Sequence, residues 1–302
     1  MWFGYALLTT LAWGGADFFY KKGTDSNDSY SHLKIIIMVG LVMGIHAVLY
    51  MFVKDITLNP MDLIMYLPVS ALYILSMGIG YIGLRYLELS IASPIQNSSG
   101  AVTTLLLFIF FTHEMKFLHV LGIAIITLGV IGIAYVEKQQ EKEYYQLNQQ
   151  TIDKKYQIGF MAILFPIMYC LLDGMGTFAD AIYLDELKLI SEDSALIAYE
   201  MTFFICAILS YIYLKFKKKE NFYFFKERDK GCAAILETTG QFFYVFAMSQ
   251  NAIFAAPLIA SYSIVSILLS RLFLKEKLNK KLYILIAFVI FGIALLGLAD
   301  EL

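Results

Sequence analysis

Long apolar stretches recur along the whole chain, and their length constrains its fold more than any other feature of the sequence. A membrane-spanning helix needs about 20 mostly apolar residues, because each residue rises about 1.5 Å across a hydrocarbon layer about 30 Å thick. Ten stretches meet or approach this length: Phe3 to Tyr20, Leu33 to Val53, Leu63 to Leu84, Ile91 to Thr112, Phe117 to Val136, Ile158 to Ala179, Ala195 to Leu214, Cys232 to Met248, Ala255 to Leu274 and Leu282 to Ala299. None alternates with period two, as barrel strands would. The sequence therefore predicts an all-α integral membrane protein with ten transmembrane helices.

Composition and cysteine spacing narrow the class further. Hydrophobic residues make up 59% of the 302 positions and charged residues 16%, against about 25% charged residues in soluble domains. The first stretch has no basic leader and no small-residue cleavage site, so we expect it to stay in the mature protein. Cys170, Cys206 and Cys232 show no paired spacing, which predicts neither a disulfide framework nor a metal site, and we expect no cofactor.

The distribution of basic residues predicts an orientation. With ten spans, 20 of the 23 Lys and Arg residues fall in odd-numbered connections, and the other side holds only Lys54, Lys116 and Lys188. The positive-inside rule then places the odd-numbered connections in the cytosol and both termini outside. The basic run from 215 to 230 is explained by this topology, so nucleic acid is not an expected partner. We expect a multi-pass protein of the cell membrane, as a monomer or homodimer, with the lipid bilayer and a small molecule as its partners.

The second half of the sequence repeats the first. At an offset of 163 the matching pairs include Tyr81 with Tyr244, Pro94 with Pro257 and Ser98 with Ser261. The prolines carry most weight, because the chain has only 5, and each can occupy the first turn of a helix, where its missing N–H is not needed. At an offset of 155 to 156, Gly4 matches Gly159 and Asp17 matches Asp173.

The repeat predicts how the chain is organised. Residues 1–137 form a first five-helix repeat, 138–157 a polar linker, and 158–302 a second five-helix repeat. Because five is odd, the second repeat threads the membrane in the opposite sense. Inverted repeats of this kind are typical of transporters, in which the binding site lies near the midplane between the halves. The inverted repeat therefore favours a transporter over an enzyme.

Three segments carry a resemblance to a known family: "ALLTTLAWGGADFFYKKG", "THEMKFLHVLGIAIITLGVIGIAY" and "LKEKLNKKLYILIAFVIFGIALLGL". Together with the five-plus-five arrangement, they resemble the EamA-type members of the drug/metabolite transporter superfamily over nearly the whole chain. The resemblance implies a fold of two inverted five-helix repeats, with ten helices around a central cavity and the fourth and ninth helices at the interface of the halves. It also implies secondary transport, often export, of small metabolites. Members of that family commonly keep both termini in the cytosol, whereas the lysine distribution here points the other way.

Ionisable side chains within the predicted spans are the candidates for function. An ionised side chain at the bilayer centre costs about 2.5 to 3.5 kcal/mol, so such residues usually face a bundle interior or a wet cavity. They are Asp17, His46, Asp173, Glu200 and Glu237. The excess of acids favours a cationic or zwitterionic substrate, or carboxylates that exchange protons. Asp17, His46, Asp173 and Glu237 are accordingly the candidates for proton coupling.

Aromatic residues accompany two of these acids. Trp13 and Asp17 lie one turn apart, and this pair could hold an ammonium group by charge and cation–π attraction; alternatively, Asp17 pairs with Lys21 and Lys22. Tyr169 precedes Asp173 by one turn, and the alternative for Asp173 is a hydrogen bond between packed helices.

The remaining cavity candidates come from the third, fourth, eighth and ninth spans. Glu237, Gln241 and Tyr244 form a polar stripe that would face protein or water, unless Glu237 reaches the boundary near Arg228 and Lys230. The resemblance implies that Asn97 and Tyr262 line the pathway, with interhelical hydrogen bonds as the alternative. In the third span Tyr66, Tyr73 and Tyr81 form an aromatic stripe, which is more often packing than a ligand site. Of these three, Tyr81 is included among the cavity candidates.

The sequence thus predicts a secondary transporter rather than an enzyme. Its substrate would be a small metabolite or an amphipathic or cationic compound, exported by alternating access with proton coupling as an option. The alternative is a membrane-embedded enzyme or flippase acting on a lipid-linked substrate, but no H-E-x-x-H, aspartate cluster or G-x-S-x-G motif appears.

Overall fold

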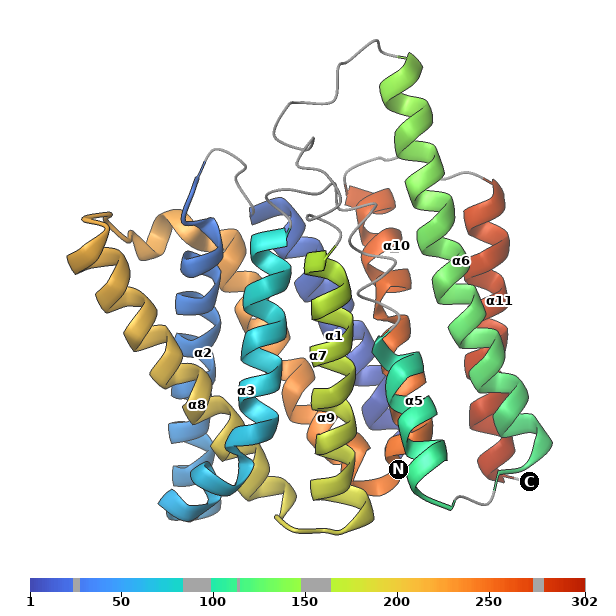
Figure 1. Ribbon diagram of the computed structural model, residues 1–302, viewed down its shortest axis with the longest axis horizontal. Coiled ribbons are helices and arrows are strands. Elements are labelled where there is room, and N and C mark those ends of the chain that lie inside the picture. The colour runs from blue at the N-terminus through green and yellow to red at the C-terminus, as the bar shows by residue number, and fades with distance from the viewer. Residues whose placement is uncertain (24–27, 84–98, 113–114, 148–163, 274–279, 302) are drawn as a thin grey trace. The chain divides into compact units, whose positions relative to one another are not determined.

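The computed structural model describes residues 1–23, 28–83, 99–112, 115–147, 164–273 and 280–301 (Figure 1). In these ranges every regular element is helical: α1 (Trp2–Gly23), α2 (Ser31–Lys54), α3 (Pro60–Gly83), α5 (Ser99–Phe110), α6 (Phe117–Leu147), α7 (Leu164–Ala181), α8 (Glu192–Ile212), α9 (Arg228–Ile259), α10 (Ser263–Phe273) and α11 (Lys280–Glu301). Shorter helices are η3 (Ile182–Glu186), η4 (Tyr213–Lys217), η5 (Phe224–Glu227) and η6 (Ala260–Tyr262). The prediction of an all-α protein is confirmed.

Several of these helices are long and apolar enough to cross a membrane. Within the described residues they are Ser31–Lys54, Pro60–Gly80, Ile167–Glu186, Glu192–Lys217 and Phe224–Leu269, with shorter apolar helices at 99–110 and 117–133. Large apolar side chains stay exposed on them; Phe52, for example, is 86% exposed. Such surface is unfavourable in water and suited to lipid. Each of the ten predicted spans coincides at least in part with a helix, as expected for a multi-pass membrane protein.

The chain forms two compact units. The first comprises Met1–Ile74 and Ala179–Ala252, and the second comprises Leu75–Phe178 and Ile253–Leu302. Helices α3, α7 and α9 each contribute residues to both units. In the first unit α2 packs along α8, and in the second α6 packs along α11 (Figure 1).

Two glycines explain how closely α2 approaches α8. A Cβ atom at Gly40 would lie 2.2 Å from the backbone oxygen of Phe203, and one at Gly44 would lie 2.4 Å from the Phe204 ring. The spacing of four residues puts both glycines on the same face of α2. Small residues at this spacing allow helices in a membrane to pack backbone against backbone.

A break at Asn251 divides α9. Asn251 has an extended backbone (φ −167°, ψ 84°), and the predicted eighth and ninth spans lie on either side of it. The Asp185 carboxylate accepts a 2.8 Å hydrogen bond from the N–H of Ala252, where the second helical segment begins. This bond satisfies one of the N–H groups that a new helix leaves unpaired. Because that segment begins at Ala252, Pro257 lies beyond its first turn, so the predicted first-turn position of Pro257 is wrong; Pro94 lies outside the described residues.

Candidate functional site

A fully buried carboxylate lies within the first unit. Asp180, near the end of α7, has no exposed surface. The Tyr66 hydroxyl of α3 donates a hydrogen bond to Oδ1 of Asp180, and the Tyr244 side chain of α9 lies close to this carboxyl group. Oδ2 of Asp180 has no partner among the described residues. A buried carboxyl oxygen without a partner is costly in a protein interior, so this atom is suited to receive a ligand or a proton.

Aromatic side chains from four helices contact one another next to this carboxylate. The Tyr244 hydroxyl lies 2.6 Å from the Tyr73 hydroxyl, and the Trp13 ring stacks on the Tyr244 ring with centroids 5.1 Å apart. The Tyr199 ring of α8 makes a T-shaped contact with the Tyr73 ring, with centroids 5.7 Å apart. We call Asp180 together with its aromatic neighbours the Asp180 cluster; its aromatic members are Trp13, Tyr66, Tyr73, Tyr199 and Tyr244.

Close packing of α1 on α9 places Trp13 in this cluster. A Cβ atom at Gly240 would lie 2.3 Å from the Trp13 ring, so only glycine leaves room for the indole. The indole Nε1–H donates a 3.3 Å hydrogen bond to the backbone oxygen of Glu237. Gln241, one helical turn after Glu237, is buried, and its Nε2 has no partner in the described part of the chain. Of the predicted stripe of Glu237, Gln241 and Tyr244, the Glu237 backbone and the Tyr244 ring therefore contact α1 through Trp13.

The chemistry of the Asp180 cluster suits a cation. No ion pair between Asp180 and a basic side chain occurs among the described residues. A charged carboxylate in a low-dielectric interior needs a counter-charge or a proton. The faces of tyrosine and tryptophan rings attract cations, most strongly where water is excluded. An organic ammonium group would meet both requirements in one place.

A second buried acid lies between α2 and α8 of the same unit. The His46 Nδ1 lies 2.8 Å from both carboxylate oxygens of Glu200, whose side chain is fully buried. The His46 ring also stacks on the Tyr50 ring at 5.8 Å, and the Tyr50 hydroxyl donates a 2.6 Å hydrogen bond to Asp193 in the first turn of α8. The structure thus brings together His46 and Glu200, two candidates from different predicted spans.

Asp173 has different surroundings from Asp180. It lies on α7 in the second unit, where the side chains of Ser76 and Ser99 hydrogen-bond its carboxylate. The backbone oxygen of the next residue, Gly174, accepts a 3.0 Å hydrogen bond from Thr103. These contacts are the interhelical hydrogen bonds that the sequence left as the alternative role for Asp173.

The other predicted site residues are distributed over both units. Asp17 is half-buried on α1, one turn beyond Trp13, while Tyr169 on α7 and Tyr262 in η6 are half-buried in the second unit. The side chain of Tyr81 and the whole of Asn97 lie outside the described residues.

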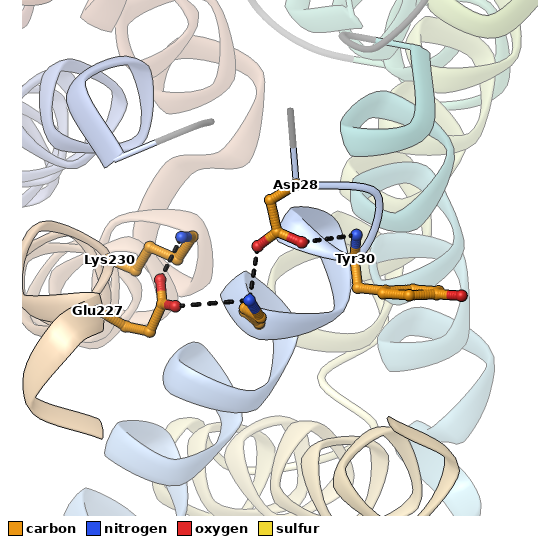
Figure 2. A network of polar contacts seen from close by, with 5 residues as sticks. Asp28, Tyr30, Glu227 and Lys230 are labelled. Atoms are coloured by element: carbon orange, nitrogen blue, oxygen red, sulfur yellow. Dashed lines mark hydrogen bonds and ion pairs between the residues drawn. The ribbon is translucent and has the colours of Figure 1, made fainter. Parts of the chain in front are cut away.

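Charged side chains gather in a different place, at the start of α2 and the start of α9 (Figure 2). Lys34 lies 2.6 Å from Asp28 and 3.8 Å from Glu227, and Glu227 also pairs with the buried Lys230. Lys22 pairs with Asp229 at 3.1 Å. These residues line an open pocket of about 850 Å³. Because the acids here already pair with bases, we interpret this group as a link between the α1–α2 connection and α9.

These pairs also bear on two alternatives that the sequence left open. Lys22, a proposed partner of Asp17, binds Asp229, and Lys230, a proposed partner of Glu237, binds Glu227.

Asp28 lies outside the membrane-spanning helices. Burial raises the pKa of its carboxyl group, but hydrogen bonds from Lys34 and from the Tyr30 N–H outweigh burial and hold that pKa below its usual value.

The sequence did not single out Asp180, because the predicted sixth span ended at Ala179 and left this acid in a loop. In the structure α7 continues to Ala181 and η3 extends it to Glu186. One signal was available. Asp180 follows Asp173 by seven residues, and Tyr66 and Tyr73 are also seven apart, which is two turns of a helix in each case.

Comparisons with known proteins agree with this architecture. The family model described as the EamA-like transporter family matches residues 1–135 and 158–298. A search of the curated proteins gives no match. A solved structure titled only "Crystal structure of protein" is similar with a TM-score of 0.67 and 12% identity, covering 96% of this chain and 98% of that one, which shows a shared fold.

The apolar helices define a multi-pass membrane protein, and the family match places it in the transporter class. The family match covers most of the chain in two parts. This chain belongs to the EamA-like transporter family and has the two-repeat architecture of that family.

Proposed function

We propose that this protein is a secondary transporter that exports a small organic cation, such as a protonated or quaternary amine, by alternating access. The observation that carries the substrate class is the fully buried Asp180 carboxylate, which binds Tyr66 through one oxygen, has no partner for the other among the described residues, and adjoins a group of contacting aromatic rings. A cation entering this cluster would supply the missing counter-charge and gain cation–π attraction. An uncharged molecule of the same shape would gain neither.

Transport is the more strongly supported of the two sequence-based alternatives, because the family to which the chain belongs is a family of transporters. We therefore propose no enzymatic role, and no lipid-linked substrate. The proposal includes export as the direction of transport, and a binding site between the inverted halves. The family resemblance and the internal repeat support both.

The Asp180 cluster can be tested with two probes of matched shape. Phenyltrimethylammonium carries a permanent charge, and tert-butylbenzene is its uncharged counterpart. For purified protein in detergent we expect saturable binding of the first and at least tenfold weaker binding of the second. Asp180→Asn keeps the shape of the side chain and removes its charge, so we expect it to weaken phenyltrimethylammonium binding at least tenfold and to abolish counterflow of this cation in proteoliposomes.

Asp55→Asn is the matched control. Asp55 is exposed in the α2–α3 connection, in a left-handed conformation (φ 54°) that asparagine tolerates. We expect this variant to bind and transport like the unmodified protein. Equal binding of the two probes, or an Asp180→Asn protein with unchanged binding, would contradict the proposed substrate class. Absence of counterflow for every cation tried, with binding intact, would contradict transport itself.

A further inference from the structure

The His46–Glu200 pair has no part in the cation site described above. We propose that this pair is a separate proton-binding site, whose single exchangeable proton is released when the organic cation occupies the Asp180 cluster. This inference rests on the proposed function. It assigns the coupling ion and the residues that hold it.

The charges around the pair favour exchange of one proton. On α8 the acidic groups are Glu200 itself and, in the first turn, Glu192 and Asp193, which reach the pair through Tyr50. Tyr50 on α2 and the uncharged Phe242 on α9 complete the surroundings of the His46 ring. None of the ion pairs among the described residues joins Glu200 to Lys or Arg. With one proton shared between imidazole and carboxylate, the pair is neutral overall. Losing that proton leaves one negative charge, which an apolar surrounding tolerates only near a cation.

The pair and the Asp180 cluster are connected by neighbouring residues of the same helices. On α8, Glu200 binds His46 and the preceding residue, Tyr199, contacts Tyr73 of the cluster. On α9, the Phe242 ring makes a T-shaped contact with the His46 ring, with centroids 6.0 Å apart, and the Tyr244 hydroxyl, two residues later, lies 2.6 Å from that of Tyr73 in the cluster. A charge in either place therefore acts on the other across one helix in an environment of low dielectric constant.

The geometry also gives the proton a route. The His46 side chain is 32% exposed, whereas that of Glu200 is fully buried. Tyr50 stacks on the imidazole, and its hydroxyl donates a hydrogen bond to Asp193 in the first turn of α8, next to the α7–α8 connection. Protons can thus reach the imidazole while Glu200 stays dry. Helix packing does not depend on the pair, because α2 and α8 already meet through Gly40 and Gly44.

The exchange is balanced in charge. When one monovalent cation binds near Asp180, the pair releases one proton to water. When the cation leaves on the other side of the membrane, the pair takes up one proton there. The net reaction moves one cation against one proton. Linkage then requires that protonation of the pair weaken cation binding by the same factor by which the cation weakens proton binding.

Two measurements on the full-length protein test this. Calorimetry of phenyltrimethylammonium binding in two buffers of different ionisation enthalpy counts the protons released. We expect about one per cation in the unmodified protein, and an affinity that rises about tenfold per pH unit where the pair titrates. We expect His46→Gln and Glu200→Gln to bind the cation without releasing a proton and with an affinity nearly independent of pH.

The second measurement uses proteoliposomes with a trapped pH-sensitive dye. A gradient of phenyltrimethylammonium should drive proton movement in the unmodified protein and in Glu220→Gln, a matched control at an exposed position. It should drive none in His46→Gln. Proton release by both variants, or counterflow without proton movement in the unmodified protein, would overturn the inference while leaving the cation site intact. If the unmodified protein bound no cation, the proposed function would fail, and this inference with it.

Discussion

Asp28 illustrates how one residue ties local electrostatics to stability. Its pKa is held below the usual value near 3.8 by hydrogen bonds from Lys34 and from the Tyr30 N–H. A carboxylate with a lower pKa in the folded state stabilises the fold at pH values above its unfolded pKa. That contribution is lost as the pH falls through the lower, folded pKa. The pH window is therefore below about pH 4.

We expect the thermal midpoint of the purified protein in detergent to fall when the pH is lowered from 5 to 3. In Asp28→Asn, part of this fall should disappear, because the group that titrates is gone, and the midpoint at pH 7 should be lower than in the unmodified protein. Asp55→Asn, at an exposed position, should keep the full pH dependence. Identical pH profiles for Asp28→Asn and the unmodified protein would show that the Lys34 contact does not stabilise the fold.

Individual site residues were predictable only where their environment could be inferred from the sequence. His46 and Glu200 stood out because charged groups are costly in apolar spans. Their contact could not be predicted from the sequence, because the two residues are 154 positions apart. Asp180 was missed because the end of an apolar stretch does not mark the end of a helix. Tyr66 and Tyr73 looked like packing residues, and only the hydrogen bonds of Tyr66 to Asp180 and of Tyr73 to Tyr244 distinguish them from packing.

At the level of elements, the contact of α2 with α8 is the most sharply defined. The spacing of Gly40 and Gly44 is visible in the sequence as a G-x-x-x-G pattern, yet the partner helix is not. A helix interface of this kind depends on the shape of both surfaces, and the sequence of α2 specifies only one of them.

Gly40→Ala tests this interface. The added Cβ atom would lie 2.2 Å from the backbone oxygen of Phe203, so the helices must move apart. We expect a loss of about 1–3 kcal/mol in stability, typical of overpacking, measured as a lower thermal midpoint in detergent. Gly4→Ala is the control, because nothing lies within 4 Å of a Cβ atom there and alanine favours a helix over glycine by about 1 kcal/mol. Equal midpoints for both variants would mean that α2 and α8 are not in backbone contact.

For the whole molecule, the helical class and the positions of the spans followed from the sequence, because hydropathy over about 20 residues reports the thickness of the bilayer directly. The helix boundaries near Asn251 did not follow from the sequence. There an Asp185 carboxylate, 67 positions away, caps a helix that the local sequence would start later. The partition of α3, α7 and α9 between two compact units also depends on long-range packing rather than on local pattern.

Orientation is the prediction that belongs to this scale. The lysine distribution places the α2–α3 connection outside and the α8–α9 connection in the cytosol. We expect a membrane-impermeant maleimide to label Leu58→Cys in intact cells, and to label Phe225→Cys only after the membrane is opened. Both positions are exposed in the structure. The reverse pattern would give the chain the topology common in its family, with both termini in the cytosol.

The stacking of Trp13 on Tyr244 has a practical consequence for optical spectroscopy. The chain has 2 tryptophans, Trp2 and Trp13, and only Trp13 is a member of the Asp180 cluster. Its indole N–H is already held by the Glu237 carbonyl, so the orientation of the ring is fixed. A Trp2→Phe protein therefore carries a single tryptophan, stacked on Tyr244 of the cluster, and we expect the tryptophan emission to change when a ligand occupies the cluster.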